Sequence, residues 1–216
     1  SALMSHDDLD AAVKRVLLGE NKVCGLTRAE DAQAAYDAGA LYGGLIFVAA
    51  SPRAVSVEQA EKVMQGAPLS YVGVFRNASA DDVVATAAKL KLSAVQLHGD
   101  EDQAYISALR AQLGEQTQIW KALSVTTTLP PRNLEHVDKY VLDNGQGGTG
   151  KSFDWSLLTG ETLDNVLLAG GLGADNCVQA AKAGCAGLDF NSGVESEPGI
   201  KDASKLASVF RTLRAY

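Results

Sequence analysis

The feature that most constrains the fold is a repeated alternation of short apolar runs and alanine-rich stretches that begins after Gly19. The apolar runs are continuous, which is typical of parallel strands that are buried on both faces. Eight strands are expected, at 21–25, 42–48, 69–75, 93–97, 117–122, 139–143, 165–169 and 186–190. Helices are expected between them, at 28–38, 57–65, 80–91, 101–112, 174–183 and 201–214.

The number and length of these units predict the architecture. Residues 21–216 allow roughly 24 residues for each strand, helix and pair of loops, which is a sufficient length. We predict an α/β fold with a single (βα)8 barrel, close to the lower length limit of about 200 residues for this class. The helices expected after the fifth and sixth strands are less well supported. Pro130 and Pro131 shorten any helix near 132–137, and 154–158 holds only a turn. An open, doubly wound sheet is the competing architecture, although it usually has fewer strands.

The segment 1–20 differs from the rest of the chain. It carries an apolar stripe at the spacing of an amphipathic helix that ends at Gly19. The stripe consists of Leu9, Val13, Val16 and Leu17. We therefore expect an extra N-terminal helix and linker at 1–20, followed by the barrel at 21–216.

Two helix starts carry the Ser/Thr-x-x-Glu/Gln pattern of a capping box. The first is Thr27 with Glu30, and the second is Ser56 with Gln59. We expect both pairs to close the first turn of the helix that follows. Gly39 stands where a left-handed residue would end the helix 28–38.

Composition excludes several classes of function. With 19 Lys+Arg against 26 Asp+Glu, the net charge of −7 argues against a nucleic-acid-binding surface. No apolar run is long enough to span a membrane, and residues 1–20 contain no signal-peptide core. The three cysteines are odd in number and lack the spacing of metal ligands. These features favour a reduced, cytoplasmic protein with no metal and no cofactor.

In a barrel the active site lies at the C-terminal ends of the strands. Glycines follow both of the last two strands, where backbone N–H groups can approach an anion. They are Gly170 and Gly171 after the seventh strand, and Gly193 beside Ser192 after the eighth. A short helix at 193–196, or the helix that begins at 174, would add its positive end. One glycine pair is most simply a tight turn, but both together favour a phosphate site.

Cys24 and Asp143 form the candidate catalytic pair. They end the first and sixth strands, which are not neighbours in a barrel and therefore face each other across its mouth. A thiolate and a carboxyl group can serve as base and acid without a metal. The alternatives are a small buried cysteine and a loop-capping aspartate. Cys177 and Cys185 are interpreted as structural.

Three further residues lie at the same rim. Arg53 has the planar fork that binds a carboxylate, although a surface arginine fits its spacing equally well. His98 is a possible general base, and a structural histidine is the alternative. Asp189 points toward the mouth in the predicted barrel, where it would orient Arg53 or His98.

At these residues the chain resembles the phosphoribosylanthranilate isomerase family of tryptophan biosynthesis. The resemblance extends over essentially 21–214 and keeps the order of the motifs. The matching runs are Lys22–Thr27, Phe47 with Ser51–Arg53, Gly73–Phe75, Val95–Gly99, Leu142–Asp143 with Gly147–Gly150, Ala169–Leu172 and Asp189–Glu195.

The resemblance implies an Amadori rearrangement, an aldose–ketose isomerisation of N-(5′-phosphoribosyl)anthranilate to 1-(2-carboxyphenylamino)-1-deoxyribulose 5-phosphate. It places the general base on Cys24, the general acid on Asp143 and the anthranilate contact on Arg53. Backbone amides around Gly170, Gly171, Ser192 and Gly193 would hold the phosphate. We expect the pKa of Asp143 to be raised and that of Cys24 to be lowered for these roles.

Residues 1–20 resemble the end of an indole-3-glycerol-phosphate synthase, which in some bacteria is fused ahead of this isomerase. We therefore expect a longer native chain with the synthase in front, and a monomer. Two alternative functions remain. One is another phosphate-binding barrel enzyme of the pathway, for which Lys121 is the only lysine at the end of a strand. The other is a catalytically silent phosphosugar-binding domain.

Overall fold

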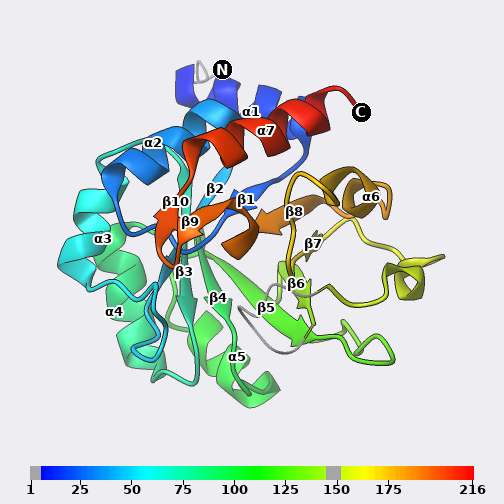
Figure 1. Ribbon diagram of the computed structural model, residues 1–216. Coiled ribbons are helices and arrows are strands. Elements are labelled where there is room, and N and C mark those ends of the chain that lie inside the picture. Colours follow the sequence, from blue (N-terminus) through cyan, green and yellow to red (C-terminus); the bar gives the residue numbers. More distant parts are fainter. Residues whose placement is uncertain (1–5, 145–151) are drawn as a thin grey trace.

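In the computed structural model, which describes residues 6–144 and 152–216, eight parallel strands form a closed barrel (Figure 1). Each strand pairs with the next, and β8 pairs with β1 to close the ring. The strands are β1 (Lys22–Val23), β2 (Tyr42–Ile46), β3 (Ser70–Phe75), β4 (Ala94–Leu97), β5 (Gln118–Ser124), β6 (Lys139–Asp143), β7 (Val166–Leu168) and β8 (Gly187–Phe190). The predicted barrel is therefore confirmed, and the open sheet is excluded.

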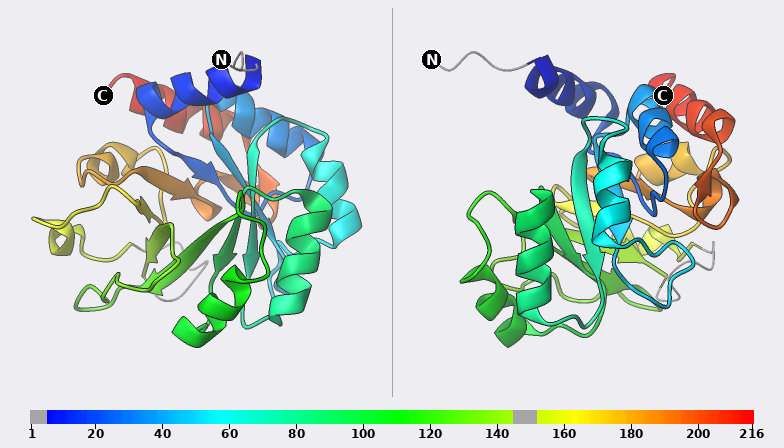
Figure 2. Two further views of the ribbon diagram at one scale, coloured as in Figure 1. Left: turned by 180° about the vertical axis from the view of Figure 1, so that it is seen from behind. Right: turned by 90° about the vertical axis from the view of Figure 1, so that its left-hand side faces the viewer.

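Helices cover the outside of the barrel (Figure 2). They are α2 (Ala29–Ala38), α3 (Val57–Met64), α4 (Ala80–Leu90), α5 (Gln103–Arg110), α6 (Cys177–Ala181) and α7 (Ala203–Arg214). As expected, no α-helix lies between β5 and β6, and the described residues between β6 and β7 hold only the 3-10 helix η1 (Trp155–Leu158). Among the described residues, no helix is both long and apolar enough to cross a membrane.

The core has two parts, on the two faces of the sheet. The larger part lies between the strands and the surrounding helices. The smaller part fills the barrel, where the rings of Tyr42 and Trp120 meet edge to face at 4.8 Å between centroids. Above this layer, Cys24 packs with Ile46 and Val74. Side chains thus fill the interior of the barrel. The layer that lines the cavity includes the candidate base, Cys24.

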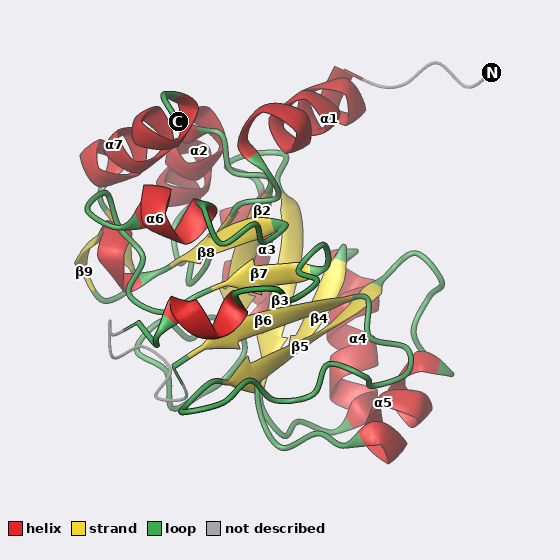
Figure 3. Cartoon of the chain, turned by 90° about the vertical axis from the view of Figure 1, so that its right-hand side faces the viewer, coloured by secondary structure: helices red, strands yellow, loops and turns green. Residues whose placement is uncertain are grey.

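The N-terminal helix α1 (His6–Leu18) lies outside the ring of barrel helices and contacts α7 (Figure 3). Its last residue, Leu18, packs against the core. The apolar stripe that predicts this helix does not, and Val16 is 84% exposed. The helix is therefore present as expected, while its apolar face has no cover among the described residues.

One of the two predicted capping boxes is correct. Ser56 accepts a hydrogen bond from the Gln59 amide, and the Gln59 side chain accepts one from the Ser56 amide. The box at Thr27 is wrong, because α2 begins one residue later with Arg28 as its N-cap and without a side-chain cap. The Thr27 hydroxyl instead donates to the carbonyl of Gly199, which ties the loop after β1 to a distant turn.

Candidate active site

A cavity of about 530 Å³ opens at the C-terminal ends of the strands. Most of the side chains and loops singled out in the sequence line it together. They are Cys24, Arg53, His98, Asp143, Gly170, Gly171, Asp189 and Ser192. Gly193 lines a second cavity that shares Gly171 with the first. The barrel mouth therefore brings together residues that are far apart in the sequence.

Cys24 follows β1 directly, and its amide donates to the Phe190 carbonyl at 2.8 Å. The thiol is buried, and burial raises its pKa above the ordinary value although the charge of Lys22 opposes the increase. Our expectation of a lowered pKa is therefore wrong for this unliganded site, because desolvation outweighs the nearby cation.

Asp143 ends β6, on the opposite side of the barrel from β1. Its carboxylate Oδ2 lies 3.4 Å from Nε2 of His98, whose other ring nitrogen lies 3.3 Å from the Gln96 amide nitrogen. The histidine is therefore next to the candidate acid and on the same side of the cavity. The glycine-rich run 145–150 that follows Asp143 lies outside the described residues.

Arg53 is buried, which excludes the alternative of a surface arginine. Its Nε and Nη2 donate to the two carboxylate oxygens of Glu195 at 2.8 and 2.7 Å. The Glu195 carboxylate also accepts a hydrogen bond from Lys201 at 2.7 Å. Burial favours the neutral acid, but these hydrogen bonds and charges hold the pKa of Glu195 at about 2. The arginine is thus fixed in place and still lines the cavity.

Asp189 orients neither Arg53 nor His98, so that expectation is wrong. Its Oδ2 binds Nζ of Lys22 at 2.8 Å, because the pairing of β8 with β1 sets the two residues side by side. Its Oδ1 and Oε1 of Gln96 are buried and have no hydrogen-bond partner among the described residues. Both residues line the cavity, although these two oxygens are themselves buried.

Glycines shape the loops after β7 and β8. Gly170 and Gly171 have φ values of +99° and +63°, which a glycine adopts without strain. A Cβ on Gly193 would lie 2.0 Å from the Leu172 carbonyl oxygen, so the two loops approach each other at this residue. Ser192 and Gly193 begin the 3-10 helix η2 (Ser192–Val194), close to the expected helix at 193–196.

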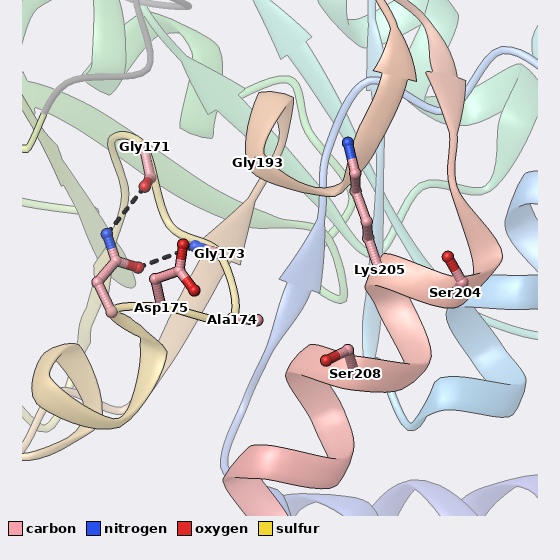
Figure 4. Close-up of a pocket in the computed structure, with 9 residues that line it drawn as sticks. Gly171, Gly173, Ala174, Asp175, Gly193, Ser204, Lys205 and Ser208 are labelled. Carbon is pink, nitrogen blue, oxygen red and sulfur yellow. Dashed lines mark hydrogen bonds between the residues drawn. The ribbon is translucent and has the colours of Figure 1, made fainter.

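The second cavity, of about 430 Å³, lies between these glycine loops and the first half of α7 (Figure 4). Ser204, Lys205 and Ser208 of α7 line it opposite Gly171 and Gly173. The helix expected from 174 starts only at Cys177, because Asn176 turns back to bond the Gly173 amide and the Gly171 carbonyl. This five-residue helix is a smaller source of positive potential than expected.

Sequence reasoning missed the partners of the rim residues. Lys22 and Gln96 could have been singled out, because a polar residue inside an apolar strand indicates a buried polar contact. Glu195 and Lys201 carried no such signal, because they lie on the hairpin of β9 (Glu195–Glu197) and β10 (Ile200–Lys201). Lys121 binds Glu101 at 2.8 Å and the Gly99 carbonyl at 2.7 Å.

The described residues contain no group of three or more His, Cys, Asp and Glu side chains placed to hold a metal ion. The described side chains place a thiol and a carboxyl group on different strands around one cavity, with an arginine and glycine loops beside them.

The family model of N-(5′-phosphoribosyl)anthranilate isomerase matches residues 21–212. The chain belongs to this isomerase family. The tryptophan biosynthesis protein TrpCF of Salmonella typhi is 74% identical over 216 residues, which make up 100% of this chain and 48% of that protein. TrpCF of Yersinia pestis is 66% identical, again over 100% of this chain and 46% of the relative. The chain thus spans about half the length of the curated relatives it matches.

Solved isomerases share the fold. Phosphoribosyl anthranilate isomerase from Thermus thermophilus is 29% identical with a TM-score of 0.81, over 91% of this chain and 98% of that one. A second isomerase, solved in complex with reduced 1-(o-carboxyphenylamino)-1-deoxyribulose 5-phosphate, is 27% identical with a TM-score of 0.76. The match covers 92% of this chain and 100% of the second isomerase. The family match begins at residue 21, so it leaves out α1 and the rest of segment 1–20.

Proposed function

We propose that this member of the isomerase family converts N-(5′-phosphoribosyl)anthranilate to 1-(2-carboxyphenylamino)-1-deoxyribulose 5-phosphate in tryptophan biosynthesis. One observation carries the assignment of residues: Cys24 and Asp143 end strands on opposite sides of the barrel and line one cavity. A substrate between them has an acid on one side and a base on the other.

Asp143 is the general acid. It donates its proton to the furanose ring oxygen, the C1′–O bond breaks, and the nitrogen lone pair forms a Schiff base. Cys24 is the general base, and as a thiolate it takes the C2′ proton to give an enolamine. Tautomerisation to the ketone completes the reaction, so protons are moved and no net oxidation occurs.

The two ends of the substrate meet different groups. The amides of Gly171, Ser192 and Gly193 donate to no acceptor within the described residues, so they are available to a phosphate. Arg53 uses Nε and Nη2 on Glu195, which leaves Nη1 for the anthranilate carboxylate. His98 lies against Asp143 and positions that carboxyl group, while Asp189 lines the same cavity and contacts the sugar.

The test follows the loss of phosphoribosylanthranilate fluorescence in variants of the two catalytic residues. Cys24→Ala and Asp143→Asn should each lower kcat by at least about 100-fold, a typical loss for a removed acid or base, with the fold intact by circular dichroism. Cys185→Ala is the matched control, because this thiol lies outside the cavity. Near-normal turnover in either catalytic variant would contradict the assignment.

The same assay separates the alternatives. A silent phosphosugar-binding domain would bind the substrate without fluorescence decay. A lysine-dependent synthase or lyase would need Lys121 as its reactive amine, but this amine is held by Glu101 and by a carbonyl.

We further propose that the native chain carries a synthase domain ahead of α1, and that the protein is a monomer in the cytoplasm. The relatives are about twice as long as this chain, and the apolar stripe of α1 is exposed. The intact mass of the native protein, together with its sedimentation, tests both points. A native mass close to 22.6 kDa would exclude the added domain.

A further inference from the structure

A buried ion pair lies beside Cys24. Lys22 is 0% exposed, and its Nζ donates to Oδ2 of Asp189 at 2.8 Å. Both residues point into the barrel, one from β1 and one from β8, and Lys22 does not line the cavity. Burying a charged lysine costs desolvation energy, which even a paired carboxylate offsets only in part. The presence of this pair inside the barrel therefore requires an explanation.

A second charged group lies beside the first. Arg53 and Lys201 both donate to the one carboxylate of Glu195, and the side chains of all three are buried. Electrostatic coupling links Cys24 to Arg53 and Lys201 as well as to Lys22 and Asp189. Ile46 and Val74, the other neighbours of the thiol, are apolar.

The charges of this cluster do not balance. Within the described residues it holds three cations, Lys22, Arg53 and Lys201, against two carboxylates, Asp189 and Glu195. One positive charge is therefore in excess within this cluster. At Lys201, burial lowers the pKa, the nearby Glu195 carboxylate opposes the decrease, and the charge of Arg53 adds to it.

We propose that the thiolate of Cys24 is the third anion of this cluster, and that Lys22, held by Asp189, is the positioning residue that supplies its counter-charge. The inference rests on the proposed role of Cys24 as the base. It gives the buried ion pair a function that the reaction scheme does not otherwise contain.

Gly44 creates the space in which Lys22 and Cys24 meet. A Cβ on Gly44 would lie 2.8 Å from Sγ of Cys24 and 3.1 Å from Cε of Lys22. The two side chains therefore face one another across a gap that only a glycine leaves open. This places the Lys22 side chain next to the sulfur in buried surroundings, where its charge acts on the thiol more strongly than it would in water.

The two members of the ion pair act on the thiol with opposite sign. Lys22 lowers the pKa of Cys24 and Asp189 raises it, with the effect of Lys22 the larger. If the ion pair were purely structural, replacing either partner would loosen the same local structure. The pKa of Cys24 would then change in the same direction in both variants. The sign of each change is therefore the diagnostic measurement.

The experiment measures the rate of Cys24 alkylation by iodoacetamide against pH, without substrate, in a Cys177→Ala/Cys185→Ala background. Lys22→Met should raise the midpoint by about one pH unit or more, and Asp189→Asn should lower it by a similar amount. The kcat of Lys22→Met should fall about tenfold for each unit of that shift, with little change in KM because Lys22 does not line the cavity.

Shifts in the same direction, or midpoints within about 0.3 pH units of the parent, would overturn the proposal. Should Lys22→Met fail to fold, Asp189→Asn decides alone, since asparagine has nearly the same shape and keeps an acceptor for Lys22. Because the titration uses no substrate, its outcome is independent of whether Cys24→Ala abolishes turnover, so failure of the proposed function remains distinguishable.

Discussion

The guanidinium of Arg53 binds the carboxylate of Glu195 through two nearly parallel hydrogen bonds, from Nε to Oε1 and from Nη2 to Oε2. This pair joins the loop after β2 to the hairpin after β8, the two strands that flank β1 in the closed barrel. The arginine enters the reaction already oriented, so little conformational entropy is lost when it binds a carboxylate.

Arg53→Ala should raise KM more than it lowers kcat, because the anthranilate carboxylate loses its contact. The matched control is Glu195→Gln, which keeps the guanidinium but weakens its support and should raise KM by a smaller factor. Fluorescence progress curves at several substrate concentrations measure both constants. An unchanged KM in Arg53→Ala would remove this residue from the binding site.

Glu195 should also make stability depend on pH. Its pKa is held at about 2, below the ordinary value, so its ionised form stabilises the fold above the unfolded-state pKa. This contribution should be lost as the pH falls from about 5 to about 2. In urea unfolding, Glu195→Gln should therefore show a weaker decrease of unfolding free energy over that range than the parent. Glu115→Gln, at an exposed position, should leave the decrease unchanged.

Gly44→Ala should disturb the base without touching the substrate. The added Cβ would lie 2.8 Å from Sγ and 2.9 Å from Cα of Cys24, which forces the thiol or its strand to move. We expect a loss of about 1–3 kcal/mol in stability from overpacking and a decrease of at least about tenfold in kcat. Gly114→Ala, which meets nothing within 4 Å, should change neither quantity.

Gly193→Ala should act on the phosphate end. Its Cβ would approach the Leu172 carbonyl oxygen to 2.0 Å, so the loops after β7 and β8 must separate. We expect a rise in KM, and weaker binding of inorganic phosphate measured as a competitive inhibitor. Gly173→Ala, in the same region, makes only an ordinary contact of 3.5 Å and should bind phosphate as the parent does.

Lys121→Met should lower stability by about 3 kcal/mol, because it leaves the buried carboxylate of Glu101 without its cation. Adding Glu101→Gln to the same chain should recover part of the loss, since the unpaired charge is then removed. Urea unfolding measures both. Lys89→Met, which removes an exposed pair with Glu61, is the control and should cost less than about 0.5 kcal/mol.

The strands were predictable because both of their faces are buried. The apolar part of a run such as 139–143 is therefore continuous rather than alternating, and this pattern is visible in the sequence. Helix starts were predictable where the cap is local, as at Ser56. Thr27 failed because its hydroxyl bonds Gly199, a residue far along the chain that competes with the local cap. A local sequence pattern cannot show that a hydroxyl will instead bond a residue far along the chain.

For the site, the residues at strand ends were predictable from the barrel alone. Their partners were not, because Lys22 meets Asp189 and Arg53 meets Glu195 only after the ring has closed. The sign of the Cys24 pKa shift depends on how desolvation compares with these same distant charges. This sign could therefore not be predicted from the sequence.

The closure of β8 onto β1 has a consequence for synthesis of the protein. A ribosome that has released the chain as far as β6 has already made Cys24 and Asp143, but not Asp189, Glu195 or Lys201. Asp189, Glu195 and Lys201 can surround the thiol only after they have been synthesised. The ionic surroundings of Cys24 are therefore completed only when synthesis has passed Lys201.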